Sequence, residues 1–337
     1  MKKFLLISIT VVIAGFVGLS LIPNDPESGE SVIVSRETDW QCSPANPVFR
    51  DFLTTENYQV ASDGHIFYGD DGSLYMIYSG SFEVYPGPSI KLARGTSWTN
   101  WSVAKPLLFE TGPSGKDIHK ETSFYRRAND GKHQIYYIGY AEELNEDTGD
   151  GYEAEIYLAE ADNLEGPYVQ QTTPIVPKGM IAGKNVYTMT SPSVVEYNGT
   201  LYIAFIGWND SPERVTEVWV IGATSYDDGR TWSNFKLVDT PIGMEGQVTK
   251  APDGTFVAVR TDEFDGSEAI YYATASHPFG PWEANPEPII VKSGADLEKH
   301  EVIAPQITFD PQTGKEFLYY TGADYWKGWW IMMAEPK

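Results

Sequence analysis

The stretch PSVVEYNGTLYIAFIGW, residues 192–208, decides the fold. Two runs rich in β-branched and aromatic residues flank the pair Asn198-Gly199, and Asn-Gly between such runs is a strong signal for a β-hairpin. Four further stretches repeat the pattern: HIFYGDDGSLYMIYSG at 65–80, TSFYRRANDGKHQIYYIGY at 122–140, VTKAPDGTFVAVRTD at 248–262 and PQITFDPQTGKEFLYYTGAD at 305–324. The turn glycines recur roughly every 60 residues, a spacing typical of repeat architectures, at Gly72, Gly131, Gly199, Gly254 and Gly314.

A second element follows each hairpin. In four repeats a strand ends in Ala and small or polar residues, and a turn then leads to an aromatic residue: IKLARGTSWTNW at 90–101, IYLAEADNLEGPY at 156–168, VIGATSYDDGRTW at 220–232 and IYYATASHPFGPW at 270–282. The fifth repeat stops after its third strand, in WIMMAEP at 330–336. We therefore predict an all-β, five-bladed β-propeller with four-stranded antiparallel blades. A segment between about Val32 and Phe52 is expected to supply the missing outer strand and close the ring, because closure removes exposed sheet edges.

The N-terminal segment has the plan of an export signal. Lys2 and Lys3 precede an apolar run from Phe4 to Ile22, which is long for a signal peptide and long enough to span a bilayer. We predict a signal peptide or membrane anchor at 1–23, a linker at 24–43 and the propeller at 44–337. Either form of the first segment places the propeller outside the cytoplasm, secreted or periplasmic.

The net charge and the cysteine count indicate which kinds of partner and cross-link the protein can have. The 337-residue chain has a net charge of −23, which disfavours nucleic acids and anionic membrane surfaces because both would repel it. Cys42 is the single cysteine, so no intrachain disulfide can form. We expect a monomer whose only contact with a membrane is the N-terminal segment, in the case where that segment is kept as an anchor.

One short motif raises a different reading. Ser225, Asp227, Gly229 and Trp232 fit the S-x-D-x-G-x-x-W box that recurs in sialidases. The box occurs once, on a closing turn equivalent to ATASHPFGPW, and the arginines form no recognisable triad for a substrate carboxylate. We interpret it as a structural turn of the third repeat, and sialidase remains an alternative.

In a propeller the start of each innermost strand reaches the central axis. Counting back from the turn glycines gives Asp63, Glu121, the pair Thr190 and Ser191, Glu245, and His300–Ala304. Converging carboxylates are what glycoside hydrolysis needs, because one acts as base or nucleophile and one protonates the leaving oxygen. For each acid the simpler alternative is a turn, rim or ion-pair residue.

The repeat forms P-x-V-V-x-x-N-G-x-x-Y-I and Y-A-T-A-S-x-x-x-G-P-W resemble those of five-bladed propeller glycosidases, above all glycoside hydrolase family 43 and its relatives in families 32, 62, 117 and 130. NPVF at 46–49 followed by ASDGHIFY at 61–68 resembles the opening of family 43. The resemblance implies that Asp63 is the general base, although Gly64 replaces the usual Pro. It also implies that Glu121, in place of the usual Asp, is the residue that modulates the pKa of its partners.

The third correspondence fails. Family 43 carries its general acid on a blade-three Glu, where this chain has Thr190, Ser191 and Pro192. Glu245 in MEGQ is one candidate for the acid, and His300 is the second, as the resemblance to family 117 allows. Loss of catalysis, leaving a sugar-binding propeller, stays open. A glycosidic phosphorylase also stays open, and it would need a basic phosphate pocket formed by Arg126, Arg127 or Arg260.

Aromatic residues offer platforms for sugar rings, whose C–H faces pack well against them. We predict substrate contacts from Trp208, Tyr187, Arg260 and Glu301, and note Tyr85, Trp326, Trp329 and Trp330 as further candidate platforms. No cofactor or metal site is expected. The acidic loop at 145–155 could hold a structural Ca²⁺, but it lacks EF-hand spacing and we interpret it as a solvated loop.

Overall fold

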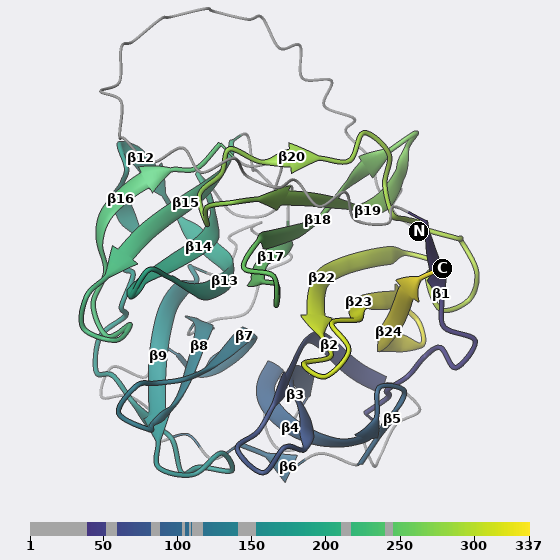
Figure 1. Ribbon diagram of the computed structural model, residues 1–337, viewed down its shortest axis with the longest axis horizontal. Coiled ribbons are helices and arrows are strands. Elements are labelled where there is room, and N and C mark those ends of the chain that lie inside the picture. The colour runs from purple at the N-terminus through teal and green to yellow at the C-terminus, as the bar shows by residue number, and fades with distance from the viewer. Residues whose placement is uncertain are drawn as a thin grey trace, which may run out of the picture. The chain divides into compact units, whose positions relative to one another are not determined.

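The computed structural model describes residues 39–51, 59–81, 88–102, 105–107, 109, 117–140, 153–209, 217–239 and 245–337. They belong to one compact unit, Arg36–Lys337, and contain strands and turns but no helix (Figure 1). None of them therefore forms a helix able to cross a bilayer. The segment at 1–23, Tyr85 and residues 145–152 lie outside the described residues.

The strands form successive antiparallel groups in chain order, and a short parallel pairing, Gln59 with Gly328 and Val60 with Trp329, joins the first group to the last in one sheet. The first group holds β2 (Gln59–Tyr68), β3 (Leu74–Ser81) and β4 (Pro88–Ser97), with β5 (Asn100–Trp101) and β6 (Lys105–Pro106) both paired to β4. The second holds β7 (His119–Arg127), β8 (His133–Tyr140), β9 (Glu155–Ala161) and β10 (Val169–Gln170). The small hairpin of β11 (Gly179–Ile181) and β12 (Lys184–Val186) comes next.

The third group holds β13 (Thr188–Tyr197), β14 (Thr200–Trp208), β15 (Val218–Ser225) and β16 (Ser233–Leu237). The fourth holds β17 (Glu245–Lys250), β18 (Phe256–Phe264) and β19 (Ser267–Ala275), with β20 (Glu283–Ala284) and β21 (Ile290–Val291) on β19. The fifth holds β22 (Glu301–Phe309), β23 (Glu316–Asp324) and β24 (Gly328–Pro336). The hairpins quoted above all form, and each turn glycine has a positive φ between 70° and 89°.

The predicted N-terminal strand is β1 (Trp40–Cys42), which pairs antiparallel to β24 with Trp40 opposite Pro336. Trp40 is buried and packs near Tyr272, with ring centroids 6.2 Å apart. Residues 40–42 thus belong to the sheet, within the segment from Val32 to Phe52 predicted to supply this strand and just before the predicted start of the propeller at residue 44. The exact position of this three-residue strand could not be read from the Pro- and Ser-rich sequence, because its hydrogen-bond partner lies almost 300 residues away.

The first strands of the groups contact one another in a cycle: β2 with β7, β7 with β13, β13 with β17, β17 with β22, and β22 with β2. In Figure 1 these strands lie toward the middle of the view, and β16 and β20 lie toward its outside. Apolar clusters fill the space between each pair of neighbouring groups, including the last and the first. The aromatic residue of each closing turn packs into the cluster shared with the preceding group, at Trp101, Tyr168, Trp232 and Trp282.

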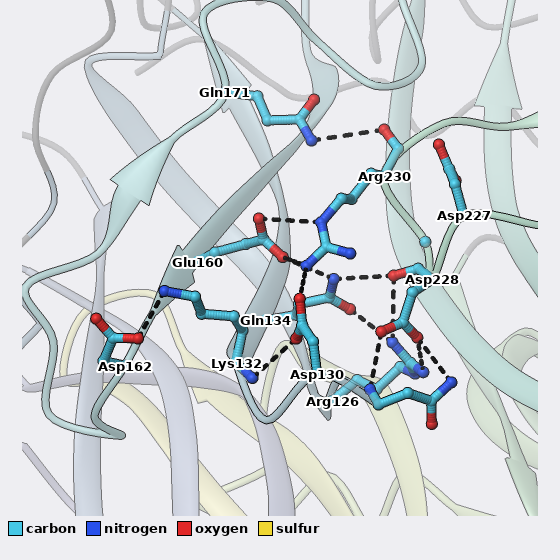
Figure 2. Close-up of polar contacts among 12 residues, drawn as sticks. Arg126, Asp130, Lys132, Gln134, Glu160, Asp162, Gln171, Asp227, Asp228 and Arg230 are labelled. Atoms are coloured by element: carbon cyan, nitrogen blue, oxygen red, sulfur yellow. Dashed lines mark hydrogen bonds and ion pairs between the residues drawn. The ribbon is translucent and has the colours of Figure 1, made fainter.

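The sialidase-like box acts as a turn. Asp227 accepts hydrogen bonds from the Ser225 hydroxyl (2.8 Å), the Thr231 N–H (2.9 Å) and the Thr231 hydroxyl (2.6 Å). Its neighbours tie the third group to the second, as Figure 2 shows: Asp228 pairs with Arg126 and accepts from the Asn129 N–H, and Arg230 pairs with Glu160 at 2.8 Å. These residues hold the turn together and fix it to its neighbour.

Candidate active site

Four of the five first strands are interrupted at the same place. Pairing with the second strand shifts between Ser62 and His65 in β2, and equivalent shifts occur in β7, β13 and β22. Each break contains a non-glycine residue with φ near +50°, a conformation that L-residues rarely adopt: Asp63, Thr122, Ser191 and Ala304. Such bulges redirect side chains and cluster beside functional sites, so they mark one end of the first strands as a candidate site.

Asp63 is held from its backbone and from its side chain. Its N–H donates to the Thr321 hydroxyl of β23 at 3.1 Å, and its carboxylate accepts from the Ser62 hydroxyl at 2.8 Å and from Ser79 of β3. Ser79 in turn accepts the Thr122 N–H at 3.0 Å. Burial raises the pKa of Asp63 above 3.8, while the two serine hydroxyls act in the opposite direction because they stabilise the ionised form.

Glu245, the first residue of β17, lies among other carboxylates. Burial raises the pKa of Glu245 well above 4.5, and the negative charges of Asp63, Glu301 and Glu121 raise it further. The Ala304 N–H donates to this carboxyl, but its Oε2 is buried with no hydrogen-bond partner among the described residues. Glu245 is therefore the group of this cluster best suited to keep a proton near neutral pH.

Asp63, Glu121 and Glu301 all lie close enough to Glu245 for their charges to act on it. The first two were predicted as catalytic residues and Glu301 as a substrate contact. Glu301 begins β22 and accepts a short hydrogen bond from the Tyr325 hydroxyl. Burial is the main cause that raises its pKa, and the charges of Glu268 and Asp63 add to it. Glu121 precedes the bulge in β7 and contributes to the field at Glu245. We call Asp63, Glu121, Glu245 and Glu301 the carboxylate cluster.

His300 lies beside the carboxylate cluster, and one of its ring nitrogens is already engaged. Its Nδ1 accepts the Tyr325 N–H at 3.1 Å and lies 3.5 Å from Asp324 Oδ1, and its ring stacks on the Tyr325 ring with centroids 4.6 Å apart. These contacts fix the ring against the turn between β23 and β24.

Trp208 and Tyr187, predicted as substrate contacts, differ in how far they are buried. Trp208 is 6% exposed and packs with Ile206, Val220 and Val238, so it belongs to the core instead of offering a ring face to a sugar. Sequence periodicity could not distinguish the two faces of β14. Tyr187 is half-buried directly before β13, and its N–H donates to the Trp208 carbonyl at 2.7 Å.

Arg260 of β18 is mostly buried. It pairs with Asp262 at 2.7 Å and lies over the Tyr271 ring, while its Nε has no hydrogen-bond partner among the described residues. Burial lowers the pKa of Arg260. Within the described residues it does not pair with any member of the carboxylate cluster.

The opposite ends of the first strands line an open pocket of about 290 Å³. It is lined by His65, Phe124, Arg126, Glu196, Lys250 and Thr308, among others. Arg126 lies five residues beyond Glu121 along β7, a span of about 16 Å at the rise of a β-strand. Arg126 is paired with Asp228 and Arg127 with Asp70, so neither forms a phosphate pocket beside the carboxylate cluster.

The third group has no acid at the start of its first strand, β13. Thr190 and Ser191 stand there, as the sequence indicated, and both are buried, at 3% and 4% exposure. Sequence reasoning missed Ser79, Thr321 and Tyr325, which hold members of the cluster from a second strand or from a turn. Only pairing across strands identifies them. In the described part of the chain, no group of three or more His, Cys, Asp or Glu residues is arranged to hold a metal ion.

The model of glycosyl hydrolases family 43 matches residues 46–330, which includes all four carboxylates. The chain belongs to glycosyl hydrolase family 43. It is therefore a glycosidase, and the family replaces the sialidase alternative. Comparison with curated protein sequences finds no match.

Solved structures of glycoside hydrolases share the fold. A thermostable family-43 glycoside hydrolase matches with a TM-score of 0.60 at 16% identity, over 82% of this chain and 88% of that one. The α-L-arabinofuranosidase PaAbf62A from Podospora anserina matches with a TM-score of 0.62 at 13% identity, over 89% and 97%. Zg3597, a family 117 glycoside hydrolase from Zobellia galactanivorans, has the same score and identity, over 89% and 91%. At these identities the likeness concerns the fold alone.

Proposed function

We propose that this family-43 enzyme hydrolyses a glycosidic bond of a poly- or oligosaccharide with inversion, using Asp63 as general base and Glu245 as general acid. The observation that carries the proposal is the contrast between the two carboxyls. Burial raises the pKa of both groups, but two serine hydroxyls oppose the rise at Asp63, whereas three neighbouring carboxylates add to the rise at Glu245. Paired carboxyls whose surroundings push their pKa values apart are the usual acid and base of a glycosidase.

In this mechanism Asp63 accepts a proton from water as the water oxygen attacks the anomeric carbon. The bond from that carbon to the leaving oxygen breaks, and Glu245 transfers its proton to that oxygen. The water adds on the face opposite the leaving group, so the product has the inverted anomeric configuration. Each turnover leaves Asp63 protonated and Glu245 ionised, and exchange with solvent restores both.

Glu121 and Glu301 would then act through charge. Both raise the pKa of Glu245 and so help it to hold the proton until the leaving oxygen needs it. His300, whose Nδ1 accepts the Tyr325 N–H, is given no acid role in this proposal. Glu245 on the fourth group would replace the glutamate that the family resemblance placed on the third.

We also propose that the five antiparallel groups are the blades of a five-bladed propeller, with the carboxylate cluster over one end of its axis. Support comes from the cyclic contacts of the first strands and from the apolar clusters between neighbouring groups. Lys2, Lys3 and the apolar run that follows support export, with the segment either cleaved or kept as an anchor. We propose a monomer as the exported form.

The names of the structural relatives guide the choice of substrates. They include α-L-arabinofuranosidases and an endo-1,4-β-xylanase, so arabinofuranosides, xylosides and their polysaccharides come first in a panel. NMR of the first sugar released tests the stereochemistry, and assays with and without phosphate separate hydrolysis from phosphorolysis. Retention of configuration, or turnover that requires phosphate, would contradict the proposal.

A further inference from the structure

The turn between β23 and β24 presents an indole ring to solvent. Trp326 is 81% exposed, more than any other large hydrophobic residue of the described chain. Its neighbours in the turn, Tyr325 and Lys327, have partners, whereas the Trp326 ring stacks on no other ring within the described part of the chain. Exposure alone marks no site, because singly exposed apolar residues are common on protein surfaces. The place of this turn in the molecule sets Trp326 apart.

The turn is fixed in place. The Trp326 N–H donates to Asp324 Oδ1 at 3.0 Å, and the Lys327 N–H donates to the Asp324 carbonyl at 2.8 Å. Lys327 also lies 3.3 Å from Asp296. Tyr325 is held by the His300 ring and by the carboxylate of Glu301. The platform is therefore preorganised, and a ligand would not have to order the backbone that carries the indole.

The same contacts place the turn that carries Trp326 beside the carboxylate cluster. Trp326 follows Tyr325, whose hydroxyl donates to Glu301; the charge of Glu301 acts on Glu245, and that of Asp63 acts on Glu301. Of these two turn residues it is Tyr325, and not Trp326, whose side chain bonds a member of the cluster in the described part of the chain. A ring bound on Trp326 would then be a sugar other than the one whose bond is cleaved.

We propose that Trp326 is a remote subsite that stacks against a sugar unit of a neutral polysaccharide whose cleaved bond lies over the carboxylate cluster. This rests on the proposed function. A neutral polymer fits best because the chain carries a net charge of −23, which would repel an acidic glycan. A single ring flanked by Lys327 and Asp296 is small for a protein interface, which typically buries roughly 800 Å² on each partner.

The test compares polymer with small substrate in the full chain. Trp326→Ala should lower kcat/KM on a neutral polysaccharide roughly fivefold to tenfold, the scale of one lost aromatic stacking contact, and leave kcat/KM on an aryl glycoside unchanged. Trp326→Phe should recover part of the loss. Tyr226→Ala is the matched control, since Tyr226 is 75% exposed on the turn of the third group and should affect neither substrate.

Equal losses on both substrates, or no loss on the polymer, would overturn the subsite. Affinity electrophoresis in gels containing the polysaccharide tests the platform without turnover. Asp63→Asn should be retarded and the double variant Asp63→Asn, Trp326→Ala should migrate freely, and equal migration would overturn the proposal. The electrophoresis tests the Trp326 subsite even if the wild type cleaves no glycoside. Absence of cleavage would refute the proposed function but not the subsite. A dimer in size-exclusion chromatography that Trp326→Ala abolishes would identify a second copy as the occupant instead.

Discussion

Replacing Glu245 by Gln removes a proton donor while keeping the shape of the side chain. General acid catalysis contributes about 10²–10⁴ in rate, so kcat should fall by that factor for a sugar leaving group, equivalent to about 3–5 kcal/mol of transition-state stabilisation. A leaving group that departs as a stable anion needs no proton. With a dinitrophenyl glycoside, kcat of Glu245→Gln should therefore fall by a much smaller factor.

The structure also predicts the effect on stability. The amide of Gln can still accept the Ala304 N–H, and it removes a group whose charged form is opposed by burial and by three carboxylates. The melting temperature of Glu245→Gln should be equal to or above that of the wild type, as measured by calorimetry. Glu283→Gln, on the exposed β20, is the matched control and should change neither rate nor stability.

A series of glycosides whose leaving groups differ in basicity tests whether Glu245 is the general acid. Glu245→Gln should show a loss that grows steadily as the leaving group becomes more basic, whereas Asp63→Asn should lose the same large factor with every leaving group. A uniform loss for Glu245→Gln, or a drop in its melting temperature that accounts for the lost activity, would show that this residue is structural rather than an acid.

Three further outcomes follow from the same structure. The acid limb of the pH–rate profile should lie above pH 3.8, since burial raises the pKa of the base Asp63, and the alkaline limb, set by Glu245, should disappear in Glu245→Gln assayed with a dinitrophenyl glycoside. Because the folded pKa of Glu245 exceeds its unfolded value, its contribution to stability is complete below pH 4.5 and is lost as pH rises through the folded pKa. The melting temperature of Glu245→Gln relative to the wild type should accordingly increase with pH, and a constant difference would contradict the shift. Asp228→Ala should lower the free energy of unfolding in urea by about 3 kcal/mol, because it leaves the mostly buried Arg126 unpaired, whereas Asp162→Ala, at an exposed pair, should cost less than about 1 kcal/mol.

The fold could be predicted from the sequence because its hairpins are local. Asn198-Gly199 and its equivalents specify turns whose strands are adjacent in the chain, and the aromatic residues of the closing turns pack where the repeats place them. The closing strand could be predicted only to a range of about 20 residues, because β1 is three residues long and its pairing with β24 leaves no local pattern.

The site was predictable in part for the same reason. Asp63, Glu121 and Glu245 were found by their distance from a turn glycine, which is a property of a single repeat. Ser79 and Tyr325 act on a carboxylate of another strand, so no periodicity shows them. The left-handed conformations of Thr122 and Ala304 were equally hidden, because neither residue type favours them.

The pairing of β1 with β24 has a consequence for synthesis. Trp40 leaves the ribosome among the first residues of the domain, yet its partner Pro336 is made almost 300 residues later. During that interval β24 does not exist, and the apolar cluster that will bury Trp40 is incomplete. The early strand must therefore stay unpaired without binding another chain, and at a length of three residues it offers little edge for one to join. The short length of β1 thus reduces the risk of aggregation during synthesis, and its pairing with β24 completes the sheet of the folded protein.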